Sequence, residues 1–170
     1  PIKNHEGFLE AAALIHAALP EVHYVMAGKN VCESNQDLLR MIEDYKLSKC
    51  VHLLGHRKDI EKLMTGIDVH VSASHTEAFP NVIGEAMAGG TPSVATDVGD
   101  SAWIIGDTGK VVRRGNMQAL AEGVTDLLMM PLENRQALGR KARARIKEEF
   151  EIGKVAALYQ QFFFHLADSR

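Results

Sequence analysis

Residues 68–96 read DVHVSASHTEAFPNVIGEAMAGGTPSVAT, and this stretch decides the fold. It opens with an apolar, β-branched run at 68–74 that is typical of a strand, and it closes with a second such run at 92–96. Between the runs, apolar residues recur at helical spacing from about residue 80 to 88, where two glycines can end a helix. Two strands joined by a helical crossover run parallel. The stretch therefore predicts a strand–helix–strand unit of a parallel sheet.

The same alternation extends over the rest of the chain. Apolar stripes predict helices around residues 8–19, 38–45, 60–64 (after Asp59 as N-cap), 117–127 (after Asn116 as N-cap), 133–149 and 152–167. Short apolar runs predict further strands at 22–28, 51–55 and 109–112. Such alternation is typical of a parallel sheet with helices on both faces, in which ligands bind beyond the carboxyl ends of the strands. We expect a single α/β domain over residues 1–170.

Composition excludes several classes of protein. The chain has 170 residues, 46% of them hydrophobic and 24% charged, as expected for one soluble globular domain. Its net charge of −3 gives no reason to expect a nucleic-acid partner. Cys32 and Cys50 lack the spacing of a metal site, and no apolar run approaches the ~20 residues of a membrane span. A reducing, cytoplasmic location fits these features.

Two carboxylates flank the start of the predicted helix. Glu77 follows the strand directly, and Glu85 lies about one turn into the helix, which begins near Pro80 or Asn81, with Asn81 as a candidate N-cap. The first turn of a helix offers free N–H groups and a positive dipole end, which suit a phosphate. Carboxylates accept hydrogen bonds from sugar hydroxyls. Together these features favour a nucleotide sugar over an acid–base pair, whereas the plain alternative is two solvated charges.

The stretch SHTEAFPNVIGEAMAGGTPSVATDVG closely resembles the E-x7-E region of family 4 (group 1) glycosyltransferases, which are retaining enzymes with the GT-B fold. The resemblance covers nearly all of residues 1–165, including KNHEGFLEAAALIHAALPEVHYVMAG and VHLLGHRKDIEKLMTGIDVHVSAS. It implies a three-layer Rossmann-like domain, the C-terminal, donor-binding half of the enzyme. It also implies that the first strand, an arginine at the end of that strand and the N-terminal acceptor domain lie outside this chain.

The resemblance implies roles for individual residues. Glu77 would be the catalytic-site carboxylate that contacts the donor sugar, Glu85 would bind the ribose hydroxyls, and Lys3 would neutralise phosphate charge. Backbone amides near the helix start would bind the sugar and diphosphate, and the loop at 55–58 would line the base. These further residues are Ala78, Phe79, Pro80, Asn81, Val82 and Ile83 for the helix start, Arg57 and Lys58 for the base, and Lys62 for a more distal charge. Ala78 stands where glycine is commoner in the family, and Gly84 where a larger apolar residue is usual.

The family's reaction transfers a hexosyl group with retention, and its usual account is a front-face reaction in which the leaving phosphate helps to deprotonate the acceptor. On that account the residues stabilise charge and orient the sugar. The sequence has no D-x-D motif, and its eight histidines lack zinc spacing, so we expect neither a metal nor another cofactor. The isolated chain is expected to bind donor with little or no turnover.

The C-terminal helices suggest further partners. A basic face over residues 135–147 is either solvated or in contact with anionic lipid at the inner face of a membrane, because many related enzymes use lipid-linked acceptors. The run Phe162-Phe163-Phe164 predicts an exposed patch, or one hidden by self-association. The acceptor, a glycan, a lipid-linked glycan or a small molecule, would bind on the N-terminal domain.

Two other functions are alternatives to the donor-binding hypothesis. A dinucleotide-binding domain predicts a G-x-G-x-x-G motif after a strand, and VMAGKNVCESN lacks it. A non-catalytic interaction domain would have lost the phosphate site or its glutamates, whereas Lys3, Glu77 and Glu85 are all present.

Overall fold

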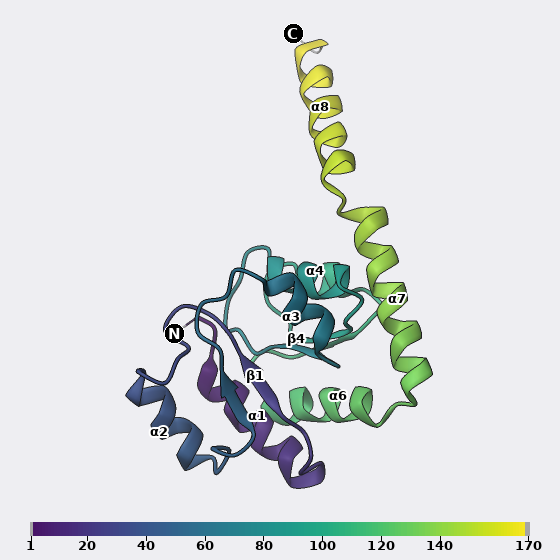
Figure 1. Cartoon of the computed structure of the whole chain (residues 1–170). Helices are drawn as coiled ribbons and strands as arrows, with labels where there is room; N and C mark the ends of the chain where they lie inside the picture. Colours follow the sequence, from purple (N-terminus) through teal and green to yellow (C-terminus); the bar gives the residue numbers. More distant parts are fainter. Residues whose placement is uncertain (1, 169–170) are drawn as a thin grey trace.

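The computed structural model of the chain describes residues 2–168. The elements alternate along the chain in the order α1 (His5–Ala18), β1 (Tyr24–Met26), α2 (Gln36–Asp44), β2 (Val51–Leu53), α3 (Ile60–Gly66), β3 (His70–Ser72), α4 (Asn81–Ala88), β4 (Ser93–Thr96), α5 (Ser101–Ile105), β5 (Lys110–Val112), α6 (Met117–Met129), α7 (Leu132–Glu149) and α8 (Ile152–Asp168). The predicted α/β alternation is confirmed, and the short helix α5 is an addition to it (Figure 1).

Helix boundaries follow local capping chemistry. The carboxamides of Asn4, Asn35 and Asn116 accept hydrogen bonds from backbone amides in the first turns of α1, α2 and α6. Asn116 therefore acts as predicted. Asn81 does not: Pro80 is the N-cap residue of α4 and Asn81 is its first helical residue, so the Asn81 side chain cannot cap. Asp59 stands at the N-cap of α3, but its side chain makes no cap bond.

All strand pairs are parallel, as predicted, but the described residues form two sheets instead of one. β1 pairs with β2, with Tyr24 opposite Val51, and β4 lies between β3 and β5. β1 and β3 do not pair with each other. The start of the chain lies against the end of β3 instead, where the His75 amide donates to the Ile2 carbonyl at 2.9 Å.

Helices cover both sides of β4, whose four residues are all buried. Val94 packs into a large core that is shared with α1, α2 and α6, whereas Ala95 packs into a smaller core that is shared with α4, α5 and α7. Because adjacent strand residues point to opposite faces, these two cores are the two interfaces between the sheet and its helical layers, which gives a three-layer arrangement. The three-layer expectation is therefore confirmed.

The two C-terminal helices differ in their relation to the body. α7 packs along α4, whereas α8 projects away from the rest of the molecule (Figure 1). Two cations of the predicted basic face of α7 make hydrogen bonds within the protein. Arg135 binds the Asp68 carboxylate at 2.6 Å, and Arg145 donates to the carbonyls of Ile104 and Trp103. Among residues 2–168, no helix combines the length and the apolar character needed to cross a membrane.

Candidate functional site

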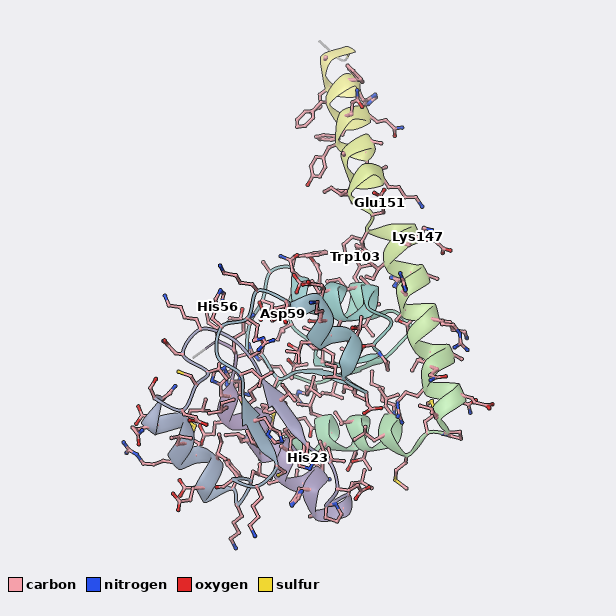
Figure 2. The ribbon with its side chains drawn as sticks, in the orientation of Figure 1. His23, His56, Asp59, Trp103, Lys147 and Glu151 are labelled. Atoms are coloured by element: carbon pink, nitrogen blue, oxygen red, sulfur yellow. The ribbon has the colours of Figure 1, made fainter. Side chains whose placement is uncertain are left out.

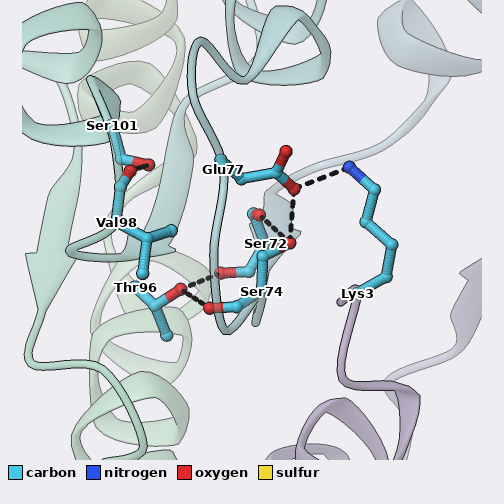
Figure 3. A network of polar contacts seen from close by, with 7 residues as sticks. All are labelled: Lys3, Ser72, Ser74, Glu77, Thr96, Val98 and Ser101. Carbon is cyan, nitrogen blue, oxygen red and sulfur yellow. Dashed lines mark hydrogen bonds and ion pairs between the residues drawn. The ribbon is translucent and has the colours of Figure 1, made fainter. Parts of the chain in front are cut away.

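The carboxyl end of β3 carries a compact polar network centred on Glu77 (Figure 3). The Lys3 ammonium donates to Glu77 Oε1 at 2.6 Å, and the Ser74 hydroxyl donates to the same oxygen at 2.7 Å. The Glu77 side chain is only 13% exposed, whereas that of Lys3 is 57% exposed. A nearly buried carboxylate is thus held between a buried hydroxyl and a cation that reaches it from solvent.

Behind this pair, β4 fixes the loop that presents Glu77. The Thr96 hydroxyl donates to the Ser74 carbonyl at 2.7 Å and lies 3.4 Å from the Ser72 carbonyl. The carbonyls of Glu77 and Ala78 crowd Gly99, where a Cβ atom would lie 2.5 and 2.2 Å from their oxygens. Gly99 has a φ of 51°, in the left-handed region that favours glycine. The β4–α5 loop therefore supports the Glu77 loop through a contact that only glycine allows.

Electrostatics keep Glu77 ionised. Burial pushes the pKa of the Glu77 carboxyl upward, but the hydrogen bonds from Lys3 and Ser74 outweigh burial and hold this pKa below its usual value. Glu77 is therefore a hydrogen-bond acceptor at neutral pH and cannot serve as a general acid there.

The helix that follows leaves its N-terminus open. No side chain caps α4; the Asn81 amide donates to the Phe79 carbonyl and the Ile83 amide donates to the Pro80 carbonyl, both at 3.0 Å. Pro80 is buried, whereas Ala78, Phe79 and Asn81 are exposed. Ala78 does not have a positive φ, so the loop forms without the glycine that the resemblance favours at this position.

Glu85 lies in a cleft that does not include Glu77 among its lining residues. This cleft, of about 580 Å³, lies between α3, α4 and α7 and is lined by Ile60, Glu61, Thr65, Glu85, Ala88, Gly89 and Arg143. The two glutamates of the motif therefore face different surroundings: one is nearly buried against Lys3, and the other is exposed in an open cleft.

The basic residues expected near a base lie on the loop before α3 and on α3. The Arg57 guanidinium forms two hydrogen bonds with the Asp59 carboxylate, at 2.8 and 2.7 Å. The hydrogen bond from Arg57 holds the pKa of Asp59 below its usual value. This pairing is also why Asp59 does not cap α3, and Figure 2 shows Asp59 beside His56 on this loop. Lys58 and Lys62 are exposed.

Sequence reasoning missed the residues that support Glu77. Ser74 and Thr96 are buried hydroxyls, and Gly99 supports the loop through its backbone. The signal was present, because serine begins the S-x-x-E pattern and glycine follows the strand at 93–96. Within the described part of the chain, no three His, Cys, Asp or Glu side chains gather in a way that could hold a metal ion.

The sequence is similar to a known protein family and to several curated proteins. The family model for glycosyl transferases group 1 matches residues 1–130. The putative glycosyltransferase EpsD of Bacillus subtilis is 30% identical over 164 residues, which cover 94% of this chain and 42% of that protein. The N-acetyl-alpha-D-glucosaminyl L-malate synthase of Bacillus anthracis is 28% identical over 129 residues, covering 75% of this chain and 34% of that protein. The chain thus spans less than half the length of these curated relatives.

Solved structures show the same fold. HepE of Anabaena, in complex with UDP and glucose, is 26% identical, with a TM-score of 0.81 over 99% of this chain and 46% of that one. The C-terminal domain of the group 1 glycosyl transferase LpcC from Francisella tularensis is 24% identical, with a TM-score of 0.74 over 89% of this chain and 81% of that one. The second match is to a C-terminal domain by itself.

Proposed function

This chain belongs to the glycosyl transferases group 1 family, and from that premise we propose that it is the donor-binding domain of a retaining glycosyltransferase. The observation that carries the proposal is the Glu77 network, in which an ionised, nearly buried carboxylate stands at the carboxyl end of a parallel strand and directly before an uncapped helix. Ligands of such sheets bind at this edge.

The proposed donor is a nucleotide diphosphate sugar. Glu77 accepts hydrogen bonds from hydroxyls of the transferred hexosyl ring, while the backbone amides of Phe79 to Ile83 and the N-terminus of α4 bind the diphosphate. Lys3 is exposed, with three donors on a flexible stem, so it can keep Glu77 and still reach a phosphate oxygen. The complex of HepE with UDP and glucose supports a ligand of this class.

The nucleoside is proposed to lie toward α3 and the cleft that Glu85 lines. Glu85 would accept from the ribose hydroxyls, and Arg57, Lys58 and Lys62 would border the base. Two hydrogen bonds join the edge of the Arg57 guanidinium to the Asp59 carboxylate. The flat face of the guanidinium therefore stays available for stacking on a base.

The reaction we propose leaves Glu77 unprotonated throughout. The acceptor hydroxyl attacks the anomeric carbon on the face from which the diphosphate departs, so that one C–O bond forms as the other breaks. The acceptor proton passes to the leaving phosphate oxygen. Lys3 and the α4 amides stabilise the charge that grows on the diphosphate. Since the sequence has no D-x-D motif, we propose that donor binding does not depend on a metal ion.

The acceptor is proposed to bind outside residues 1–170, on another part of a longer protein, because the chain spans less than half of its curated relatives. On this view the chain alone binds donor and transfers little or no sugar. A glycan, a lipid-linked glycan or a small molecule would each fit this arrangement.

Ligand-observed NMR tests the proposal. UDP, GDP, ADP, NAD and inorganic phosphate are offered to the chain separately, with and without EDTA. We expect saturation transfer to one nucleoside diphosphate, unchanged by EDTA. Equal transfer to every compound, or to NAD alone, would contradict a donor site.

A substitution then tests the ribose contact. Glu85→Ala should weaken the nucleotide by about 1.5–3 kcal/mol, because it removes a hydrogen bond to a charged group. Glu43→Ala, which replaces another exposed glutamate, on α2, is the matched control and should leave the affinity unchanged. Equal affinity in both variants would remove Glu85 from the site.

A further inference from the structure

Three aromatic rings from separate elements meet next to the Glu77 loop. Phe79 precedes α4, Trp103 lies in α5, and Phe150 follows α7. The ring of Trp103 is 4.8 Å from that of Phe150 and 6.3 Å from that of Phe79, centroid to centroid, and both pairs are edge-to-face. Trp103 is nevertheless 58% exposed and Phe79 42% exposed. Figure 2 shows Trp103 at the end of the body from which α8 departs.

These rings are held in place although two of them, Phe79 and Trp103, are exposed. Arg145 of α7 donates from Nε to the Ile104 carbonyl at 3.0 Å and from its guanidinium to the Trp103 carbonyl at 2.5 Å. The same guanidinium lies 5.9 Å from the centre of the Phe150 ring. The backbone of α5 is thereby fixed to α7, so the Trp103 ring is a pre-positioned surface that needs little ordering when a ligand arrives.

The aromatic surface adjoins the Glu77 loop directly. The Asp100 amide donates to the Ala78 carbonyl at 3.0 Å, and Gly99 touches the carbonyls of Glu77 and Ala78. Asp100 is the N-cap residue of α5, but its exposed carboxylate makes no cap bond. Asp100 and Trp103 are three residues apart on one helical turn, so they share one side of α5.

We propose that Trp103, Phe79 and Asp100 form a binding site for the pyranose ring of a saccharide, a statement that rests on the proposed function. One face of a pyranose ring presents C–H groups, which pack on the negative face of an aromatic ring, while its hydroxyls donate to a carboxylate. The carboxylates of Asp97 and Asp100 on this loop disfavour a phosphate or another anion, and favour a neutral polyhydroxyl ligand.

The ring could come from the donor or from the acceptor, and the chemistry is the same in both cases. Trp103 is the only tryptophan of the chain, so its fluorescence reports this site alone. UDP, UDP-glucose and methyl α-glucopyranoside are each titrated against the chain, the glycoside also in the presence of saturating UDP. We expect a blue shift of Trp103 emission with UDP-glucose or with the glycoside, and none with UDP.

Variants assign the source by ligand-observed NMR. Trp103→Ala should weaken the sugar-containing ligand at least about fivefold while leaving UDP unchanged, because the lost contact area lies against the ring. A loss with UDP-glucose assigns the donor ring, and a loss with the glycoside but not with UDP-glucose assigns the acceptor ring. Phe162→Ala, an exposed aromatic residue on α8, is the control and should change neither.

The outcomes separate this proposal from the one before it. If UDP binds but Trp103 emission stays constant with both sugars, or if Trp103→Ala weakens neither, the aromatic site is wrong and the donor domain stands. If UDP does not bind while the glycoside shifts Trp103 emission, the aromatic site stands and the donor domain is wrong. A shift that depends only on protein concentration would assign Trp103 to self-association and overturn the proposal.

Discussion

Glu77 illustrates how one oxygen atom can serve two neighbours. Its Oε1 accepts from both Lys3 and Ser74, which leaves the capacity of Oε2 for a ligand. The desolvation that a nearly buried carboxylate suffers is offset by these two charge-assisted bonds. The Glu77 carboxylate is therefore ready to accept hydrogen bonds from hydroxyl groups before any ligand arrives, which is the condition for pre-organised binding.

The crowded position of Gly99 leads to a prediction about the Glu77 loop. Gly99→Ala places a Cβ atom 2.2 Å from the Ala78 oxygen, in a residue whose φ is 51°. We expect a loss of about 1–3 kcal/mol in the free energy of unfolding and weaker nucleotide-sugar binding, since the loop must move. Urea unfolding and ligand-observed NMR measure the two effects.

A second glycine, Gly115, serves as a control that separates the cost of backbone strain from the cost of the steric clash at Gly99. Gly115 has a φ of 79°, but a Cβ atom there meets nothing within 4 Å. Gly115→Ala should cost only the backbone strain, about 1 kcal/mol, and leave sugar binding intact. If both variants behaved alike, the contact between Gly99 and the Glu77 loop would have no special role.

His70 leads to a prediction about pH. It is buried at the start of β3, with Nδ1 3.2 Å from the Ser93 hydroxyl, and burial lowers its pKa from 6.5 to about 4. Below pH 6.5 the His70 side chain is protonated in the unfolded chain but stays neutral in the folded chain. Stability should therefore be full above pH 6.5 and fall by about 2–3 kcal/mol as the pH drops toward 4.

Urea unfolding between pH 7 and 5 measures this slope. His70→Gln should reduce this slope, because no titrating group remains at position 70. His75→Gln, which replaces an exposed histidine five residues away, should leave the slope as it is. A slope that is unchanged by His70→Gln would assign it to other groups, such as His5, whose pKa burial also lowers.

At the scale of single elements, helix α4 contains Gly84, and the packing around this position does not require a glycine. A Cβ atom on Gly84 would meet only the Ile146 side chain of α7, at 4.0 Å, and Gly84 does not have a positive φ. Gly84→Ala should therefore stabilise the chain by about 0.5–1 kcal/mol, by restricting the unfolded backbone and by filling space against α7.

Helix α7 contains a glycine, Gly139, whose surroundings leave no room for a side chain. A Cβ atom on Gly139 of α7 would lie 1.9 Å from the Gly90 carbonyl, so Gly139→Ala should push α7 away from the end of α4 and lower the melting temperature. Calorimetry should show a rise of about 2–4 °C per kcal/mol for Gly84→Ala. A fall for both variants would mean that α4 needs Gly84 for a reason other than space.

Local patterns predicted most elements because each carries its own signal. The asparagine cap of α6 and the paired glycines after α4 are chain-local, and both occur as predicted. α5 was missed because its five residues complete barely one turn and present no periodic stripe. Asp59 was misjudged for a different reason: Arg57 competes for its carboxylate, and no pattern ranks a salt bridge against a cap.

The candidate site was predictable where side chains carry the chemistry. Lys3 and Glu77 were both singled out, and the structure brings them together at 2.6 Å. The support by Thr96, the crowding at Gly99 and the aromatic surface around Trp103 arise from contacts between residues that are distant in sequence. Such contacts depend on the packing of β4 and α5 against the Glu77 loop, and residue spacing does not reveal them.

For the whole molecule, the division into two sheets has a structural cause. His70 directs its amide to β4, so Val71 and Ala73 direct theirs to the opposite edge of β3, where the described residues offer no strand. On β1, the Val25 amide likewise points to the edge that does not face β2. The His75–Ile2 bond continues that open edge.

The projecting helix α8 leads to the last prediction. Ile152, Val155, Tyr159, Phe162 and Leu166 follow a three–four spacing, which is the seam of a short coiled coil. Phe162, Phe163 and Phe164 are 57%, 61% and 61% exposed, so the single chain displays the patch that the sequence predicted. Exposed apolar area of this kind favours association. We expect the chain to dimerise through α8 as its concentration rises.

Sedimentation velocity from low to high micromolar concentration measures this association, and a hydrophobic dye reports the patch on the monomer. Phe162→Glu places a charge in the seam and should keep the chain monomeric while leaving nucleotide binding unchanged, because α8 projects away from the Glu77 site (Figure 1). Gln160→Glu adds the same charge outside the seam and should dimerise as the unmodified chain does. A monomer that binds no dye at high concentration would show that α8 packs on the body in solution. In that case the exposed aromatic seam would have an intramolecular partner, and the association would not exist.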